Sequence, residues 1–283
     1  MYPCGRIAAA IAIVGCWTLT LSAQWPDIRT TGPLTASGAP NLEASAPKLA
    51  DGRTPDLSGV WDADKFPCNE TTAALGCIDA PQGIPFGAIN IAGQNTELPM
   101  QPWAAELFKQ HRDAAGKDDT IARCLPVSPA RAWASFALQK IIQTPDTVVI
   151  LDEYMIQFRQ IFLDGRALPK DPEPTFKGYS IGKWDGEALV IETIGLKDNG
   201  WLDLQGHPLT DQARITERIR RVDYGHLQVD ITVNDAKAYT QPWTRTVKLT
   251  LAPKTELLEY ICNENEKSTP HMVGPSAELR RNH

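Results

Sequence analysis

The second half of the chain alternates between apolar and polar residues with a period of two, and this pattern limits its fold most. Every second residue is apolar from Leu227 to Val233 and again from Val247 to Leu251, and the residues between them are polar. Successive side chains of a β-strand point to opposite faces of its sheet. The pattern therefore predicts strands with one buried face and one solvated face.

Turn residues separate a series of such segments between about residue 138 and residue 264. The strongest hairpin signal is Asp185-Gly186, which lies between residues 177–184 and residues 187–195. Further turns are predicted at Asp164-Gly165, at Asp223-Tyr224-Gly225, and at Pro253-Lys254 between residues 244–251 and 255–262.

Eight or nine strands at this spacing, with almost no helix signal between them, predict a mainly β protein. We expect an antiparallel meander that closes into a lipocalin-like β-barrel, because closure removes exposed sheet edges. A barrel of about eight strands is either filled by its own side chains or holds one small ligand.

The chain before the barrel is expected to be irregular, with one short helix around Pro102–Ala115, where Pro102 suits the first helical position. A short strand is predicted at Asp56–Trp61. The predicted divisions are a signal peptide (1–23), a flexible leader (24–55), an irregular arm packed on the barrel (56–136), the barrel (137–267) and a tail (268–283).

The apolar run Ile7–Leu21 follows Arg6 and precedes the small residue Ala23, which is typical of a secretory signal. The run is shorter than the roughly 20 residues of a membrane span. We expect an exported protein, periplasmic or extracellular, without a transmembrane span in its mature chain. Residues 13–16 also fit a lipoprotein cleavage box, so lipid anchoring through Cys16 stays open.

Cleavage after Ala23 would leave four cysteines, and an even number in an oxidising compartment favours disulfides. The local pair Cys68–Cys77 would close a short loop, which leaves Cys124–Cys262 to join an early loop to the last predicted strand. A zinc site is the alternative, although the sequence has no C-x-x-C motif.

The net charge and the absence of cofactor motifs limit the kinds of molecule that we expect the protein to bind. Lys plus Arg number 28 and Asp plus Glu number 34, a net charge of −6 that argues against duplex nucleic acid as the partner. Zinc-protease, Walker and dinucleotide-binding motifs are absent from the sequence, so no metal or other cofactor is expected. A small molecule is the expected ligand or substrate, and the sequence does not set the oligomeric state.

Two segments invite a catalytic interpretation. Gly178–Gly182 matches G-x-S-x-G, but a hairpin follows Ser180 where a nucleophile elbow needs a helix, so we reject a hydrolase triad. The loop that follows holds His207 and Asp203, and such a pair can act as general acid or base. The alternative is a loop histidine that caps a turn or bonds a backbone group.

Charged residues on apolar strand faces form a third signal. Glu217 lies between Ile215 and Ile219 on one predicted strand face, and Glu259 lies between Leu257 and Ile261 on another. Arg159 shares a face with Ile161 and Leu163. Buried charges need partners, so a Glu–Arg network would either orient a polar ligand or act as a structural ion pair. Glu217 is a third candidate catalytic group. Aromatic candidates for a ligand pocket, or for the core, are Tyr154, Tyr179, Trp184, Trp201, Trp243 and Tyr260.

Several motifs together resemble a family of exported bacterial proteins without established function. The resemblance covers roughly residues 55–266 and implies export and a β-rich body, but no activity. The hairpin at Trp184-Asp185-Gly186 and the meander also look like lipocalin-type barrels in shape. Some lipocalin-type barrels are hydratases or isomerases. The motifs are Leu98–Trp103, Arg123–Pro126, Phe158–Arg166, Gly182–Gly186, Thr216–Arg218 and Glu259–Glu264.

Three functions fit these patterns. The first is an exported barrel that binds a small, partly apolar molecule. The second is a cofactor-free hydrolase, lyase or isomerase that uses His207 and Asp203 at the barrel mouth, helped by Glu217 or Arg159. The third is a structural envelope protein whose barrel interior is simply packed.

Overall fold

The computed structural model describes residues 28, 32–66, 84–85, 97–114, 116–198 and 200–263. The predicted signal peptide, Cys16, the Cys68–Cys77 pair and the predicted tail 268–283 lie outside these residues. Within the described residues, no helix is long and apolar enough to cross a membrane.

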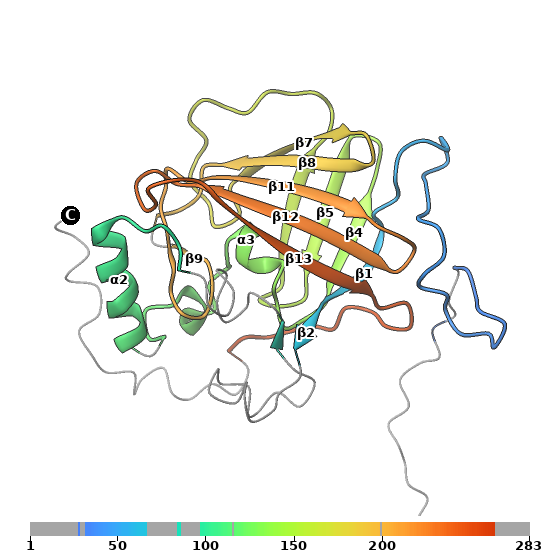
Figure 1. The fold of residues 1–283 in the computed structure, drawn as a ribbon, viewed down its shortest axis with the longest axis horizontal. Coiled ribbons are helices and arrows are strands. Elements are labelled where there is room, and N and C mark those ends of the chain that lie inside the picture. The colour runs from blue at the N-terminus through green and yellow to red at the C-terminus, as the bar shows by residue number, and fades with distance from the viewer. Residues whose placement is uncertain are drawn as a thin grey trace, which may run out of the picture.

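The fold is a closed barrel of nine strands, which confirms the prediction of a mainly β barrel (Figure 1). Around the barrel the order is β1-β13-β12-β11-β8-β7-β6-β5-β4. The strands are β1 (Gly59–Ala63), β4 (Gln139–Gln143), β5 (Thr147–Asp152), β6 (Gln157–Phe162), β7 (Tyr179–Asp185), β8 (Ala188–Ile194), β11 (Arg214–Arg221), β12 (His226–Asn234) and β13 (Trp243–Leu251).

The period-two pattern fills the barrel with apolar side chains. Along β12, Leu227, Val229, Ile231 and Val233 are buried and the residues between them are not. Trp61 on β1 is fully buried in the same cluster. The interior is therefore largely packed, which is the filled alternative for a small barrel.

One strand pair departs from the predicted antiparallel meander. β6 and β7 run parallel and pair at Ile161–Ser180 and Phe162–Ile181, whereas the other neighbouring pairs of the barrel are antiparallel. Asp164-Gly165 does not make a hairpin, because the connection 163–178 contains prolines that cannot donate ladder hydrogen bonds. The chain loops out instead and begins β7 beside the end of β6.

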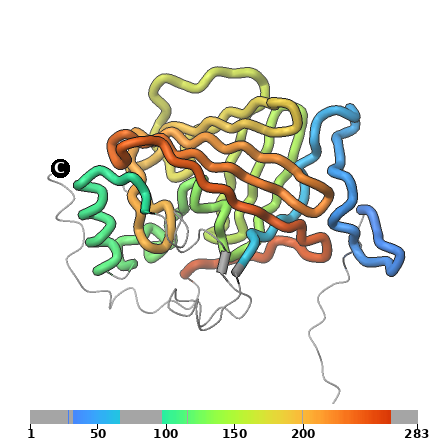
Figure 2. Tube along the Cα trace, viewed as in Figure 1, coloured from blue at the N-terminus to red at the C-terminus, as the bar shows by residue number. Residues whose placement is uncertain are grey.

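The predicted strand 255–262 is wrong. The edge of β13 that it would need is already occupied by β1, which pairs with β13 at Trp61–Leu251 and with β4 on its other side. Residues 252–263 form no strand, and they run back beneath the barrel in the view of Figure 2. A disulfide between Cys124 and Cys262, as predicted, ties this segment down.

The predicted helix is present as α2 (Pro102–Asp113), with proline in its first turn. It lies beside the loop that carries two short paired strands, β9 (Gly200–Trp201) and β10 (Pro208–Leu209) (Figure 1). The remaining short elements are a 3₁₀ turn, η1 (Thr120–Arg123), the one-turn helix α3 (Pro129–Ala132), and the paired strands β2 (Lys65–Phe66) and β3 (Ile84–Pro85).

The described part of the expected flexible leader contacts the barrel. The backbone N–H groups of Tyr224 and Gly225, in the turn between β11 and β12, donate to the carbonyls of Ala44 and Leu42 at 2.7 Å each. A Cβ atom at Gly225 would lie 2.4 Å from that of Leu42, so glycine permits this close approach.

We expect the double variant Cys124→Ser/Cys262→Ser to unfold more readily. The bridge joins cysteines 138 residues apart, so its loss should lower the free energy of unfolding by about 2–4 kcal/mol. Urea-induced unfolding of variant and parent, with intact mass to verify the oxidised parent, measures the difference. An unchanged midpoint would contradict a stabilising role for the bridge.

Candidate functional site

A groove of about 530 Å³ lies at the boundary between β6 and β7, which we call the seam. Backbone pairing between the two strands is confined to the end of β6 and the start of β7. The first part of β6 therefore has no strand partner on its seam side. The described residues that line this seam groove are Pro126, Ile156–Gln160, Phe162 and Thr175–Ser180.

Strand alternation gives the seam groove two kinds of side chain. Phe158 points outward and is 63% exposed, whereas its neighbour Arg159 points into the barrel and is 5% exposed. Phe162, Phe176 and Tyr179 add further aromatic surface. The groove is aromatic at its outer walls and cationic where it meets the barrel interior.

Arg159 is fixed by a carboxylate on the opposite wall of the barrel. Its two terminal nitrogens donate to the two carboxylate oxygens of Glu217 on β11, at 2.7 and 3.0 Å. The indole N–H of Trp133, which follows α3, also donates to Glu217. Glu217 is fully buried, so this bidentate pair satisfies a charge that would otherwise be costly inside the barrel.

A second buried ion pair joins a lining residue of the groove to β5. The ammonium of Lys177 lies 2.7 Å from the Asp152 carboxylate, to which the side-chain amide of Gln139 also donates at 2.8 Å. Burial lowers the pKa of Lys177 from its ordinary value, and the opposing charge of Asp152 acts against that shift.

The two ion pairs share an orientation. Arg159 and Lys177 line the seam groove, whereas Glu217 and Asp152 lie behind them in the barrel. Two further basic side chains lie over the lining rings: Arg166 over Phe162, at 3.9 Å, and Lys197 over Phe176, at 4.9 Å. Arg166 is itself paired with the Asp164 carboxylate at 2.6 Å. Among the described residues that line the groove, none is acidic.

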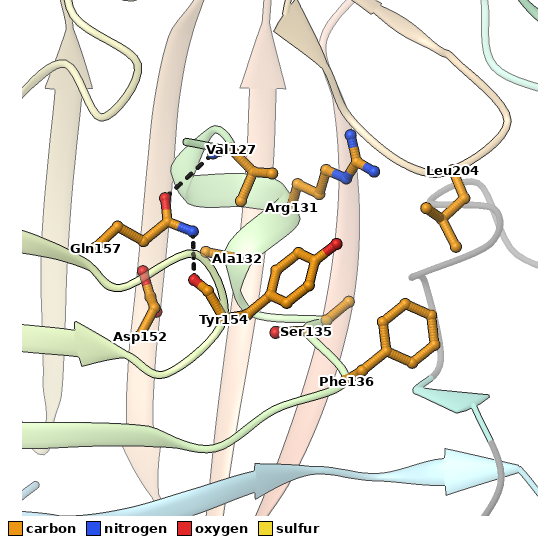
Figure 3. Close-up of a pocket in the computed structure, with 10 residues that line it drawn as sticks. Val127, Arg131, Ala132, Ser135, Phe136, Asp152, Tyr154, Gln157 and Leu204 are labelled. Atoms are coloured by element: carbon orange, nitrogen blue, oxygen red, sulfur yellow. Dashed lines mark hydrogen bonds between the residues drawn. The ribbon is translucent and has the colours of Figure 1, made fainter. Parts of the chain in front are cut away.

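A much smaller cavity of about 20 Å³ lies behind Asp152, large enough for one water-sized occupant (Figure 3). Gln157 accepts a hydrogen bond from the N–H of Val127 at 3.1 Å and donates to the carbonyl of Tyr154 at 2.9 Å, as the dashed lines show. Burial raises the pKa of Tyr154 to about 12. Its ring lies 5.3 Å from that of Tyr260, so these predicted ligand-binding tyrosines meet beside this cavity.

His207 and Asp203 are adjacent, as their pairing in the sequence suggested. His207 Nδ1 lies 2.5 Å from one Asp203 oxygen, and the other oxygen accepts backbone N–H groups of Gln205, Gly206 and His207 at 3.0–3.2 Å. The imidazole is buried and stacks on Phe108 of α2 at 4.1 Å. These contacts brace the loop against α2, and neither residue lines the seam groove.

The remaining predicted site residues are dispersed. Trp201 is buried against His111, at 4.5 Å between ring centroids, and Trp184 packs partly buried against the core. Glu259 is exposed and outside any strand, which corrects the expectation of a buried charge. Ser180 is buried in β7 and shares a 2.9 Å hydrogen bond with Thr193, as expected for a strand residue rather than a nucleophile.

Several residues of the site escaped the sequence analysis: Lys177, Asp152, Phe158 and Phe176. Asp152 carries the same signal that identified Glu217, since it shares an otherwise apolar strand face with Val148 and Ile150. Phe158 and Phe176 gave no signal, because the seam groove depends on how the 163–178 connection returns to the barrel.

No protein-family model matches the chain, and no curated protein matches it in sequence. The resemblance to exported bacterial proteins therefore stays a prediction. No group of three or more His, Cys, Asp or Glu within the described residues is placed to hold a metal ion. The geometry of the seam groove thus carries the functional interpretation.

We predict strong energetic coupling between Arg159 and Glu217. Arg159→Met or Glu217→Gln alone leaves the partner's charge or polar group unsatisfied inside the barrel, which should cost about 3–5 kcal/mol. The double variant should lose much less free energy of unfolding than the two single variants lose together. We expect the difference, which is the coupling energy, to be roughly 3 kcal/mol when each variant is unfolded in urea.

The exposed pair Arg214–Glu192, 2.9 Å apart, is the matched control. Arg214→Met and Glu192→Gln should couple by less than about 1 kcal/mol. Equal coupling in the two pairs would contradict a special role for the buried one.

We predict that His207→Ala lowers stability. The change leaves a buried Asp203 oxygen without its ring partner and removes the stack on Phe108, so unfolding should become easier by about 2 kcal/mol. His226→Ala is the control, because His226 forms a similar 2.7 Å contact with Asp223 but is 40% exposed. A melting temperature unchanged in His207→Ala would instead favour the catalytic hypothesis for the pair.

Proposed function

We propose that this is an exported protein whose seam groove binds a small, partly apolar molecule. The observation that carries the proposal is the aromatic groove at the one parallel strand pair of the barrel, where backbone pairing stops and Arg159 and Lys177 are part of the lining. The Cys124–Cys262 bridge supports export, since structural disulfides persist mainly in oxidising compartments.

The size and composition of the groove suit such a ligand. Its volume of about 530 Å³ falls within the range of small-molecule sites, which are mostly apolar with a few placed polar groups. Phe158, Phe162, Phe176 and Tyr179 supply rings that can cover an apolar body, and the two cations supply the polar groups.

Backbone strain at the groove adds support. Ile156 has a φ of 41° and a side chain that is 60% exposed, and it lines the groove. A β-branched residue with positive φ is strained, and strained residues concentrate at ligand sites. Met155 also has a positive φ, of 64°, so the tight turn between β5 and β6 sets this conformation and presents the exposed isoleucine side chain at the groove.

The packed interior supports a site at the side of the barrel instead of at its mouth. Fully buried Trp61 and Trp133 occupy interior space that a central ligand would need. A purely structural barrel would share this packing but has no need for an exposed aromatic groove. The enzyme hypothesis rests on His207 and Asp203, which lie outside the groove, so it is not part of this proposal.

Binding of the neutral fluorophore 1-aminoanthracene to the full chain tests the proposal. We expect saturable fluorescence enhancement, weakened about tenfold by Phe158→Ala through the loss of one aromatic contact. Phe136→Ala is the control, because Phe136 is also exposed, at 39%, but does not line the groove. No saturable binding, or equal loss in both variants, would contradict a ligand site at the seam.

A further inference from the structure

We infer that the seam groove selects a carboxylic acid: a molecule with an apolar ring or chain whose carboxylate lies against Lys177 and Arg159. This inference rests on the proposed function and adds the chemical class of the ligand. The juxtaposition that carries it is a pair of buried cations at the inner wall of an aromatic groove.

In both ion pairs the cation lies nearer to the groove than the carboxylate does. In each pair the basic side chain is the more exposed partner: 5% for Arg159 against 0% for Glu217, and 11% for Lys177 against 3% for Asp152. The carboxylates thus lie deeper than the cations, and a molecule that enters the groove meets the basic groups before their acidic partners.

Lys177 and Arg159 each have more N–H donors than their carboxylate partners use. An ammonium has three N–H donors and a guanidinium five. Lys177 gives one to Asp152, and Arg159 gives two to Glu217. Within the described part of the chain no other acceptor bonds to either group, so both retain donors for a ligand oxygen.

The two cations are buried, so their surroundings have a low dielectric constant. A charge inside a protein interacts more strongly with a nearby opposite charge than one in water does. Burial disfavours the charged form of Lys177, as the lowered pKa indicates, and an incoming carboxylate would restore the missing stabilisation. The aromatic walls would bury the rest of the ligand.

The charged residues that line the groove differ in sign from the excess charge of the whole chain. The chain carries a net charge of −6, so acidic residues predominate on average. The described lining of the groove nevertheless has two basic residues and no acidic one, and Lys197 lies over the lining ring of Phe176. Each of the two lining cations is balanced by a carboxylate behind it, so the groove presents basic N–H donors to an entering molecule and keeps the acidic groups out of its reach.

The test compares two probes with the same ring, 1-naphthoate and 1-naphthalenemethanol, as competitors of 1-aminoanthracene on the full chain. We expect naphthoate to bind about tenfold or more tightly than the alcohol, because bonds to charged groups are the stronger ones. Lys177→Gln, which keeps a donor for Asp152 but loses the charge, should reduce this preference to about threefold or less.

Two variants complete the design. Lys183→Gln removes an exposed lysine of β7 that does not line the groove, and it should leave the preference unchanged. Lys177→Arg keeps the charge and should retain the preference for naphthoate. Thermal unfolding of each variant verifies the fold, and the comparison of the two probes on the parent chain stands even if Lys177→Gln does not fold.

The outcomes separate the inference from the function on which it rests. Equal competition by the two probes on the parent chain would overturn the carboxylate inference and leave a neutral-ligand site standing. Failure of both probes, together with absent 1-aminoanthracene binding, would overturn the proposed function itself. A preference that survives undiminished in a folded Lys177→Gln variant would also overturn the inference.

Discussion

The buried carboxylate of Glu217 is the interaction on which the site depends. It holds Arg159 across the barrel interior and also accepts the indole N–H of Trp133, so it joins β11, β6 and the segment after α3. β6 needs this connection because its backbone pairing with β7 is limited to two positions. A strand left half unpaired along one edge is held by β5 on one side and by this ion pair from within. The opening at the seam can therefore persist while the barrel stays closed.

Topology explains why the opening lies where it does. β1 enters between β4 and β13 and closes the barrel, which leaves the C-terminal segment no edge to join and directs it to the Cys124 bridge. The proline-containing connection 163–178 prevents a hairpin after β6, so β7 starts beside the end of β6 and runs parallel to it. The seam is thus a consequence of one irregular connection. The aromatic residues that line it come from both sides of that connection.

The strands, the α2 helix and the Cys124–Cys262 bridge could be predicted from the sequence, because period-two alternation, a helix-starting proline and cysteine parity are local or arithmetic signals. The Arg159–Glu217 pair could be anticipated as well, since each residue interrupts an apolar strand face. Lys177 and Phe176 could not, because their position depends on the return path of a long connection. The error at residues 255–262 has a similar origin: alternation indicates a strand, but only the barrel order shows whether a free edge exists.

We propose that small molecules enter at the seam and not at the loop around His207. Hydrogen exchange of the full chain, with and without saturating 1-aminoanthracene, tests it most directly. We expect slower exchange in residues 156–160, 162 and 175–180, which line the groove, and no change in residues 200–209. Protection confined to residues 200–209, or no protection at the seam despite saturable binding, would contradict it.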